Sequence, residues 1–119
     1  MAYVDGYVLA VPKSNVEKYR EVASIAGRVW REHGALEYRE CVAEDVKPGE
    51  LTSFPQSVLL KPDETVIFAW IVFESRAKRD EINAKVMNDP RLKDLMSEEN
   101  PICDMKRMIF GGFETLVAV

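Results

Sequence analysis

Residues 64–73, Glu-Thr-Val-Ile-Phe-Ala-Trp-Ile-Val-Phe, constrain the fold of this chain more than any other segment. Every residue from Val66 to Phe73 is apolar. A strand with one face in water alternates apolar and polar side chains, so this pattern predicts a strand whose two faces are both covered. The chain has two other long amphipathic segments, which as helices could cover one face. A second copy of the chain is the simplest cover for the other face, and the sequence therefore predicts a homodimer.

Three further strands are expected from alternating side chains and from the turn residues that bound them. They lie at 3–11, 36–42 and 105–117. The segment 36–42 carries more charge than the other strands, which is typical of the edge of a sheet. Two consecutive glycines, Gly111 and Gly112, interrupt the last segment and predict a bulge or a sharp bend there.

Two helices are expected, one on each side of the central part of the chain. The first covers 14–33, because apolar residues recur every three or four positions and Ser14 with Glu17 has the spacing of a capping box. Gly34 follows at the position where helices often end. The second helix begins after Ser75 and continues to about residue 88.

Two connections remain between these elements. Residues 44–62 contain three prolines and form a long connection, in which a short extended piece is expected at 57–60. Residues 91–100 are expected to hold a short helix that ends before Pro101.

The order of the elements, βαββαβ, predicts an α+β fold of the ferredoxin-like type. Short connections and right-handed crossovers give a four-stranded antiparallel sheet with the first and third strands central and both helices on one face. At 119 residues, the chain 1–119 is expected to form a single domain. Two such sheets that close face to face would form a dimeric α+β barrel.

Composition argues against several classes of function. The net charge of −4 argues against a surface for nucleic acid or for anionic membranes. No stretch is long and apolar enough to span a bilayer, and the first residues lack the pattern of a signal peptide, so the cytoplasm is the expected location. With two cysteines, Cys41 and Cys103, one histidine and no CxxC motif, neither a disulfide framework nor a zinc site is expected, and no cofactor is predicted.

Two residues are candidates for catalysis. His33 is the only histidine and lies on the apolar stripe of the first helix, so it is either a general acid or base or a packed structural histidine. Asp5 shares one face of the first strand with Tyr7, and if this face looks into the barrel, Asp5 is confined there. Such a carboxylate is either functional or one half of a structural ion pair, with Arg107 as the expected partner.

Other residues are candidates for binding a ligand. Arg76 and Arg79 lie in the first turn of the second helix and, with Asn83, could hold an anionic group. A carboxylate such as Asp80 could instead pair with them. Aromatic side chains of the central strands, Tyr7 and Trp70 among them, could line an apolar pocket or simply fill the space between two sheets.

Several separate motifs carry a resemblance to the YbaA-like family of small bacterial proteins. They are Tyr-Val-Asp-Gly-Tyr at 3–7, Trp-Arg-Glu-His-Gly-Ala-Leu-Glu-Tyr at 30–38, Glu-Ser-Arg-Ala-Lys-Arg-Asp at 74–80, Asn-Asp-Pro at 88–90 and Lys-Arg-Met-Ile-Phe-Gly-Gly-Phe-Glu at 106–114. The resemblance implies a dimeric α+β barrel of unknown function and brings no established catalytic residues. Some relatives carry a label that connects them with signal-recognition-particle RNA.

Three functions therefore remain open at this point. The first is a homodimer that binds a small molecule between its sheet and its helices. The second is a cofactor-independent enzyme, of the monooxygenase or isomerase type, that acts on a small organic substrate; it rests on analogy of fold alone. The third is an RNA-associated protein, which the acidic net charge disfavours.

Overall fold

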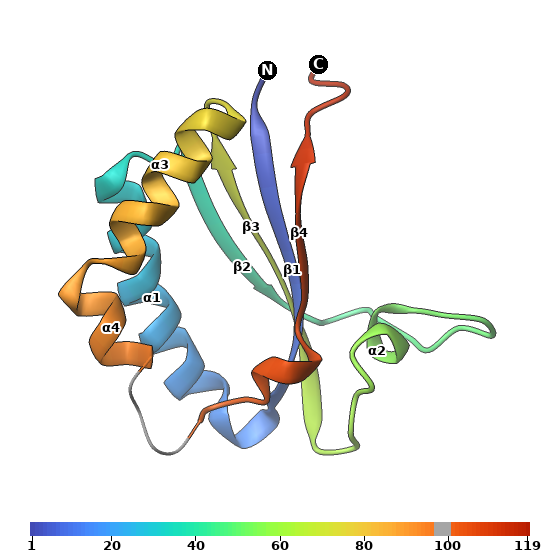
Figure 1. The fold of residues 1–119 in the computed structure, drawn as a ribbon. Coiled ribbons are helices and arrows are strands. Elements are labelled where there is room, and N and C mark those ends of the chain that lie inside the picture. The colour runs from blue at the N-terminus through green and yellow to red at the C-terminus, as the bar shows by residue number, and fades with distance from the viewer. Residues whose placement is uncertain (97–100) are drawn as a thin grey trace.

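The computed structural model describes residues 1–96 and 101–119, which form one antiparallel sheet with long helices on one of its faces (Figure 1). The four strands are β1 (Tyr3–Pro12), β2 (Glu37–Val42), β3 (Glu64–Phe73) and β4 (Ile109–Glu114). Their order in the sheet is β2-β3-β1-β4. The ferredoxin-like α+β fold, the two central strands and the position of β2 at an edge are thus confirmed.

The helices are α1 (Val16–His33), α2 (Phe54–Ser57), α3 (Arg76–Met87) and α4 (Pro90–Met96). Gly34 ends α1 with φ of 120°, and the Ser75 hydroxyl accepts a hydrogen bond from the backbone N–H of Lys78 at the start of α3, as predicted. The short helix expected within 91–100 is present as α4, and residues 97–100 lie outside the described residues. No helix among the described residues is long and apolar enough to cross a membrane.

Four local predictions are wrong. The last strand does not cover 105–117, because Met105–Arg107 form a 3-10 helix and β4 ends at Glu114. The capping box at Ser14 does not form, because a 3-10 helix (Lys13–Asn15) joins β1 to α1 and Asn15 takes the N-cap position. The extended piece at 57–60 is absent, because Ser57 ends α2, whose first turn is capped by Ser53, and a turn at 58–59 follows it. The bulge at the two glycines of β4 is also absent, because β1 and β4 pair in one continuous register from Tyr3↔Glu114 to Val8↔Ile109.

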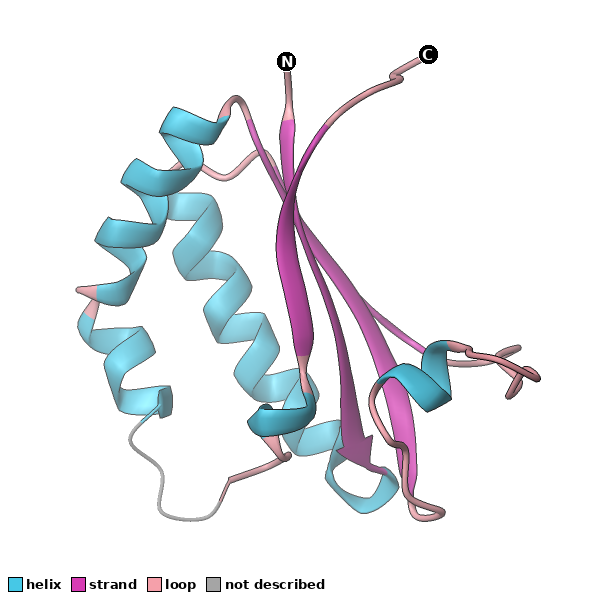
Figure 2. Ribbon diagram, turned by 45° about the vertical axis from the view of Figure 1, so that its right-hand side comes forward, coloured by secondary structure: helices cyan, strands magenta, loops and turns pink. Residues whose placement is uncertain are grey.

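The central strand β3 is apolar on both faces, and each face has a different neighbour. Four side chains, those of Ile67, Ala69, Ile71 and Phe73, face α1 and α3 and are at most 6% exposed. On the other face, Val66 is buried by Val58 of the loop that contains α2, whereas Phe68 is 42% exposed. Figure 2 shows α2 and its loop on the side of the sheet opposite the long helices. One face is therefore closed by the chain itself, and much of the other stays open.

Candidate functional site

A cleft of about 490 Å³ lies between the helix-side face of the sheet and the helices. Its floor is formed by the sheet, where the small side chain of Ala69 lies between two isoleucines of β3. The helices contribute one wall and the segment before β4 contributes the other. The side chains that matter for the argument below are Asp5, Tyr7, Tyr19, Trp30, Tyr38, Glu40, Ala69, Arg79, Asn83, Met105 and Phe110.

An ion pair between Asp5 of β1 and Arg79 of α3 lies at one end of the cleft. The Arg79 Nε atom lies 3.2 Å from Asp5 Oδ1, and the Asp5 side chain is 9% exposed. Arg79 also pairs with Asp80 at 2.8 Å and donates a hydrogen bond to the Tyr3 hydroxyl at 3.2 Å. Its guanidinium lies over the Tyr3 ring, 4.9 Å from the centroid. Asp5 is thus a buried carboxylate whose charged partner, Arg79, comes from helix α3.

Trp30 and Asn83 give this end of the cleft a second connection between the helices and the sheet. The Trp30 indole N–H donates to Asn83 Oδ1 at 3.0 Å. Because the amide oxygen is occupied, the amide N–H₂ group remains to face Asp5, with which the Asn83 side chain hydrogen-bonds. The sequence placed Trp30 only in the apolar stripe of α1, where an aromatic residue at helical spacing gives no sign of a polar role.

Burial decides how the ionisable groups of the cleft behave. Burial raises the pKa of the Asp5 carboxyl above its ordinary value, and the Arg79 guanidinium and the Asn83 amide offset part of this effect. Burial also raises the pKa of Tyr7 to about 12, with a further contribution from the neighbouring Asp5. The Tyr7 ring stacks on Phe110 with centroids 6.2 Å apart. Tyr7 is therefore a neutral, aromatic part of the wall at neutral pH.

The other end of the cleft holds a carboxylate between two tyrosines. Glu40 Oε1 accepts a hydrogen bond from the Tyr19 hydroxyl, and Glu40 Oε2 accepts one from the Tyr38 hydroxyl at 2.6 Å. Tyr38 and Glu40 stand on the helix-side face of β2, and Tyr19 comes from α1. Sequence patterns give no sign of the two tyrosine partners of Glu40, because contacts between a helix and a strand leave no spacing in the sequence.

Asp5 does not lie on the face of the sheet that would look into a barrel between two chains. Asp5 and Tyr7 point to the helices and not to the open face of the sheet, so the cleft belongs to one chain and does not lie between two sheets. Trp70 pairs with Gly6 in the register and therefore belongs to the open face, where its ring contacts Phe68 with centroids 5.5 Å apart. The backbone of β3 at Trp70 still borders the cleft.

Two other candidates lie away from the cleft. The ring of His33, at the end of α1, lies 2.9 Å from Asp89 Oδ2, so it belongs to the contact between α1 and the α3–α4 turn. Arg76 is exposed and does not line the cleft, which Arg79 reaches three residues later. The expected group of Arg76, Arg79 and Asn83 thus reduces to Arg79 and Asn83.

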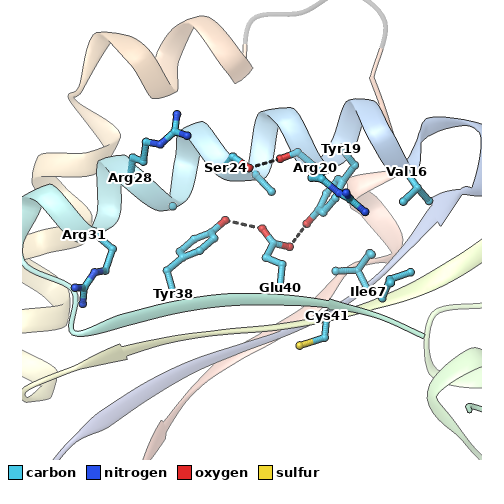
Figure 3. A pocket seen from close by; sticks show the side chains of 13 residues that line it. Val16, Tyr19, Arg20, Ser24, Arg28, Arg31, Tyr38, Glu40, Cys41 and Ile67 are labelled. Atoms are coloured by element: carbon cyan, nitrogen blue, oxygen red, sulfur yellow. Dashed lines mark hydrogen bonds between the residues drawn. The ribbon is translucent and has the colours of Figure 1, made fainter. Parts of the chain in front are cut away.

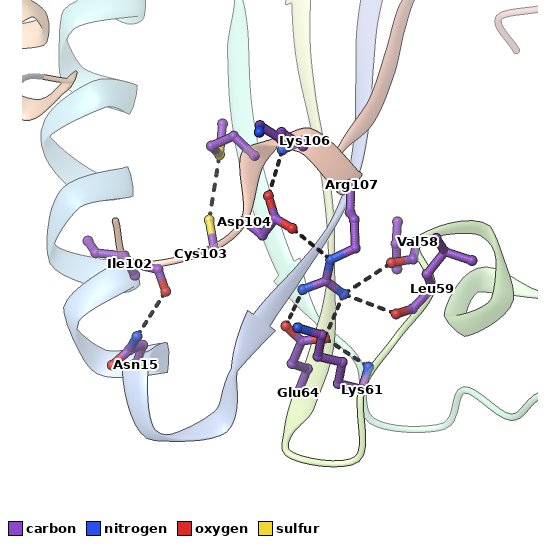
Figure 4. A network of polar contacts seen from close by, with 11 residues as sticks. Asn15, Val58, Leu59, Lys61, Glu64, Ile102, Cys103, Asp104, Lys106 and Arg107 are labelled. Carbon is purple, nitrogen blue, oxygen red and sulfur yellow. Dashed lines mark hydrogen bonds and ion pairs between the residues drawn. The ribbon is translucent and has the colours of Figure 1, made fainter. Parts of the chain in front are cut away.

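The predicted pairing of Arg107 with Asp5 is wrong. Arg107 precedes β4 and forms a bidentate pair with Glu64 at the start of β3, with contacts of 2.7 and 2.5 Å (Figure 4). It also pairs with Asp104 and donates to the carbonyl oxygens of Val58 and Leu59. The hydrogen bonds from Arg107 hold the pKa of Glu64 at about 2. Arg107 therefore fixes the loop after α2 and is remote from Asp5 because it sits at the opposite end of β1.

Comparison with known proteins identifies close relatives and more distant structures. A family model described as "Protein of unknown function (DUF1428)" matches residues 2–104. The chain is 45% identical over 117 residues, 98% of each chain, to the uncharacterized protein YbaA of Escherichia coli K12.

Similar solved structures include a variant of SnoaB, a cofactor-independent oxygenase from Streptomyces nogalater, with a TM-score of 0.63, 11% identity, and 99% and 96% of the two chains covered. Another is a dimeric ferredoxin-like protein from an uncultured marine organism, with a TM-score of 0.61, 9% identity, and 99% and 98% covered. At these identities the two structures support the fold alone.

Gly112 of β4 provides a test of how tightly Tyr3 and Arg79 are packed. A Cβ atom at position 112 would lie 2.4 Å from both the Tyr3 hydroxyl and Arg79 Nη2. We expect Gly112→Ala to destabilise the protein by about 1–3 kcal/mol, because the two side chains must move. The neighbouring Gly111→Ala places its Cβ 3.8 Å from Phe113, an ordinary contact, and should change stability far less. Thermal unfolding measures both; equal effects would contradict the packing described here.

Proposed function

Because the chain belongs to the DUF1428 family, whose function is unknown, we propose its function from the cleft: it is a homodimer in which each chain binds a small, largely apolar molecule between its sheet and its helices. The observation that carries this proposal is an aromatic and aliphatic cleft with a few polar groups confined to its two ends. Binding sites for small molecules have this composition, and about 490 Å³ lies within their usual range of roughly 300–1,000 Å³.

Ala69 is the reason that the cleft has room in its middle. Its neighbours on the helix side of β3, Ile67 and Ile71, are large and at most 3% exposed, whereas a methyl group leaves space above the sheet. The two aromatic walls, Tyr7 with Phe110 and Trp30 with Tyr38, stand on either side. A flat apolar molecule would thus lie over Ala69 with its polar groups toward Asp5 or Glu40.

The homodimer is supported by the open face of the sheet. Here Phe68, Ile109 and Phe113 are 42%, 46% and 64% exposed, and they border a shallow apolar hollow of about 640 Å³. Monomeric proteins rarely leave such a continuous apolar face in water. At roughly 25 cal/mol per Å², covering it with an identical face stabilises the pair by many kcal/mol before the cost of association. Similar solved structures described as dimeric ferredoxin-like proteins agree with this arrangement.

Filling the cleft tests the binding site. We expect the neutral fluorescent probe N-phenylnaphthylamine to bind the native protein, and Ala69→Leu to weaken its binding at least about tenfold, because the larger side chain occupies the space above the sheet. Ala84→Leu adds the same side chain on the exposed side of α3 and is the matched control. Fluorescence titration measures both, with circular dichroism to check folding. Equal affinities for the two variants would place the probe elsewhere and contradict the proposal.

Single charges on the two faces of the sheet test the dimer. We expect Phe113→Asp or Phe68→Asp to convert a dimer into a folded monomer, because the charge lies on the open face. Ile71→Asp should instead unfold the chain, since Ile71 is 3% exposed under the helices, and Ile25→Asp on the exposed side of α1 should leave the dimer intact. Light scattering at micromolar concentration gives the mass of each form. A native protein that is a well-folded monomer would overturn this part of the proposal.

The burial of Asp5 also favours a second candidate, a cofactor-independent enzyme acting on the bound molecule. A carboxyl group whose pKa is raised by burial is a better base for a proton of a substrate than an ordinary carboxylate. If the cleft is catalytic, we expect Asp5→Asn to retain binding of a substrate while its turnover falls at least a hundredfold. Oxygen uptake and product analysis on compounds found by a thermal-shift screen measure turnover. Turnover that survives Asp5→Asn would exclude this role.

The RNA-associated alternative stays a prediction of weak or absent binding, in line with the net charge of −4.

A further inference from the structure

A second hollow lies on the outside of the molecule and shares a wall with the cleft. It has a volume of about 520 Å³ and runs between α1 and β2 (Figure 3). Three side chains, those of Tyr19, Tyr38 and Glu40, line both this groove and the inner cleft. A molecule in the cleft therefore meets these three side chains at the point where the cleft comes nearest to this outer surface.

The three side chains form one hydrogen-bonded cluster with Glu40 at its centre. Figure 3 shows Tyr38 and Glu40 rising from β2 and Tyr19 descending from α1 to meet them. Each oxygen of the Glu40 carboxylate accepts one tyrosine hydroxyl. Burial, together with the charge of Glu40, raises the pKa of both tyrosines well above the ordinary value, so that both remain neutral donors. A carboxylate has about four lone-pair positions, so each oxygen can accept a further hydrogen bond.

The charge of Glu40 is not neutralised by an ion pair among residues 1–96 and 101–119. The arginines that line the outer groove are engaged elsewhere or turned away. Arg20 pairs with Glu17 at 3.3 Å, and Arg31 donates to the carbonyl oxygens of Ala35 and Leu36. Arg28 points away from Glu40 in Figure 3.

The arginines at the inner cleft have carboxylate partners of their own. Arg79 pairs with both Asp5 and Asp80, and Arg39 pairs with Glu37 on the other face of β2. Within the described part of the chain, the charged side chains that line the cleft thus offer an unpaired negative group at Glu40 and no unpaired positive group.

The helix is shaped to hold this cluster in place. Gly27 of α1 is buried against the Tyr38 ring, where a Cβ atom would lie 2.7 Å from Tyr38 Cδ1. The Trp30 ring also packs against the Tyr38 ring, with the two ring centroids 6.0 Å apart. A larger residue at position 27 would push Tyr38 away from α1, and with it the hydroxyl that donates to Glu40.

We infer that the Tyr19–Glu40–Tyr38 cluster recognises the polar end of the ligand, and that it takes a hydrogen-bond donor, a hydroxyl group or a protonated amine, in preference to a carboxylate, sulfonate or phosphate. The inference rests on the proposed function, since it concerns a ligand in the same cleft. An incoming donor finds free lone pairs on Glu40 and on the tyrosine oxygens that donate to it. An incoming anion meets a half-buried negative charge in a site where screening by water is reduced.

Three probes with one ring system and different polar ends test this selectivity. Naphthol, naphthylmethylamine and naphthoate are each used at neutral pH to displace N-phenylnaphthylamine from the native protein. We expect the alcohol and the protonated amine to bind at least about tenfold more tightly than the carboxylate. In Glu40→Gln the preference for the amine over the carboxylate should fall at least about tenfold, because the charge is removed while the size of the side chain is kept.

Helix α1 offers a matched control. Glu21→Gln removes one negative charge from the exposed side of α1, where Glu21 lines neither hollow, and it should leave the selectivity unchanged. Tyr38→Phe is a second variant for the case that Glu40→Gln unfolds at a lower temperature. It keeps the carboxylate and frees one of its lone pairs, so it should retain the preference for the amine over naphthoate.

The possible outcomes separate the two proposals. If N-phenylnaphthylamine binds with the expected dependence on Ala69 but naphthoate competes as well as the amine, the proposed function stands and the donor-selective cluster is wrong. Equal loss of selectivity in Glu40→Gln and Glu21→Gln would also overturn the inference, since it would show a general effect of net charge. If no probe enters the cleft, both proposals fail together.

Discussion

The apolar character of both faces of β3 is the constraint on which the rest of the structure depends. Its eight consecutive apolar residues, Val66 to Phe73, need two different covers. On one face the helices α1 and α3 bury Ile67, Ile71 and Phe73, which stabilises each of these side chains by roughly 1.5–3 kcal/mol relative to water. On the other face the segment with α2 covers the end of the strand near Val66, and Phe54 of α2 contacts Phe68, which is still 42% exposed. The open remainder defines where a partner would bind, and it leaves the helix side as the place for a site within one chain.

The cleft exists because one position in this otherwise well-packed layer is small. Ala69 separates two isoleucines, and the space above it is bounded at both ends by buried or half-buried carboxylates. The two carboxylates are stabilised in different ways. Asp5 has a guanidinium and an amide, which offset part of its cost of burial, whereas Glu40 accepts hydrogen bonds from two hydroxyl groups and has no ion-pair partner among the described residues. This difference gives the two ends of the cleft different chemistry.

The prediction of the fold succeeded where the signal was local and periodic. The spacing of apolar residues located α1, the unbroken apolar run located β3, and Gly34 and Ser75 located the end of α1 and the start of α3. It failed where two local preferences competed, as at Ser14 and Asn15, and where a loop was shaped by a distant residue. Arg107 illustrates the second case: its hydrogen bonds to Glu64 and to the carbonyl oxygens of Val58 and Leu59 join segments more than 40 residues apart.

The sequence by itself determined the order of the elements, the central place of β1 and β3, the need for a cover on the second face, and Asp5, Tyr7 and Arg79 as residues of interest. These follow from periodicity and charge, which act along the chain. Only the tertiary structure decided that Asp5 pairs with Arg79, that His33 and Arg107 are engaged with Asp89 and Glu64, and that Tyr19 and Tyr38 meet on Glu40. The physical reason is that a side-chain pair depends on how helices lie on the sheet, and this depends on the packing of the whole core.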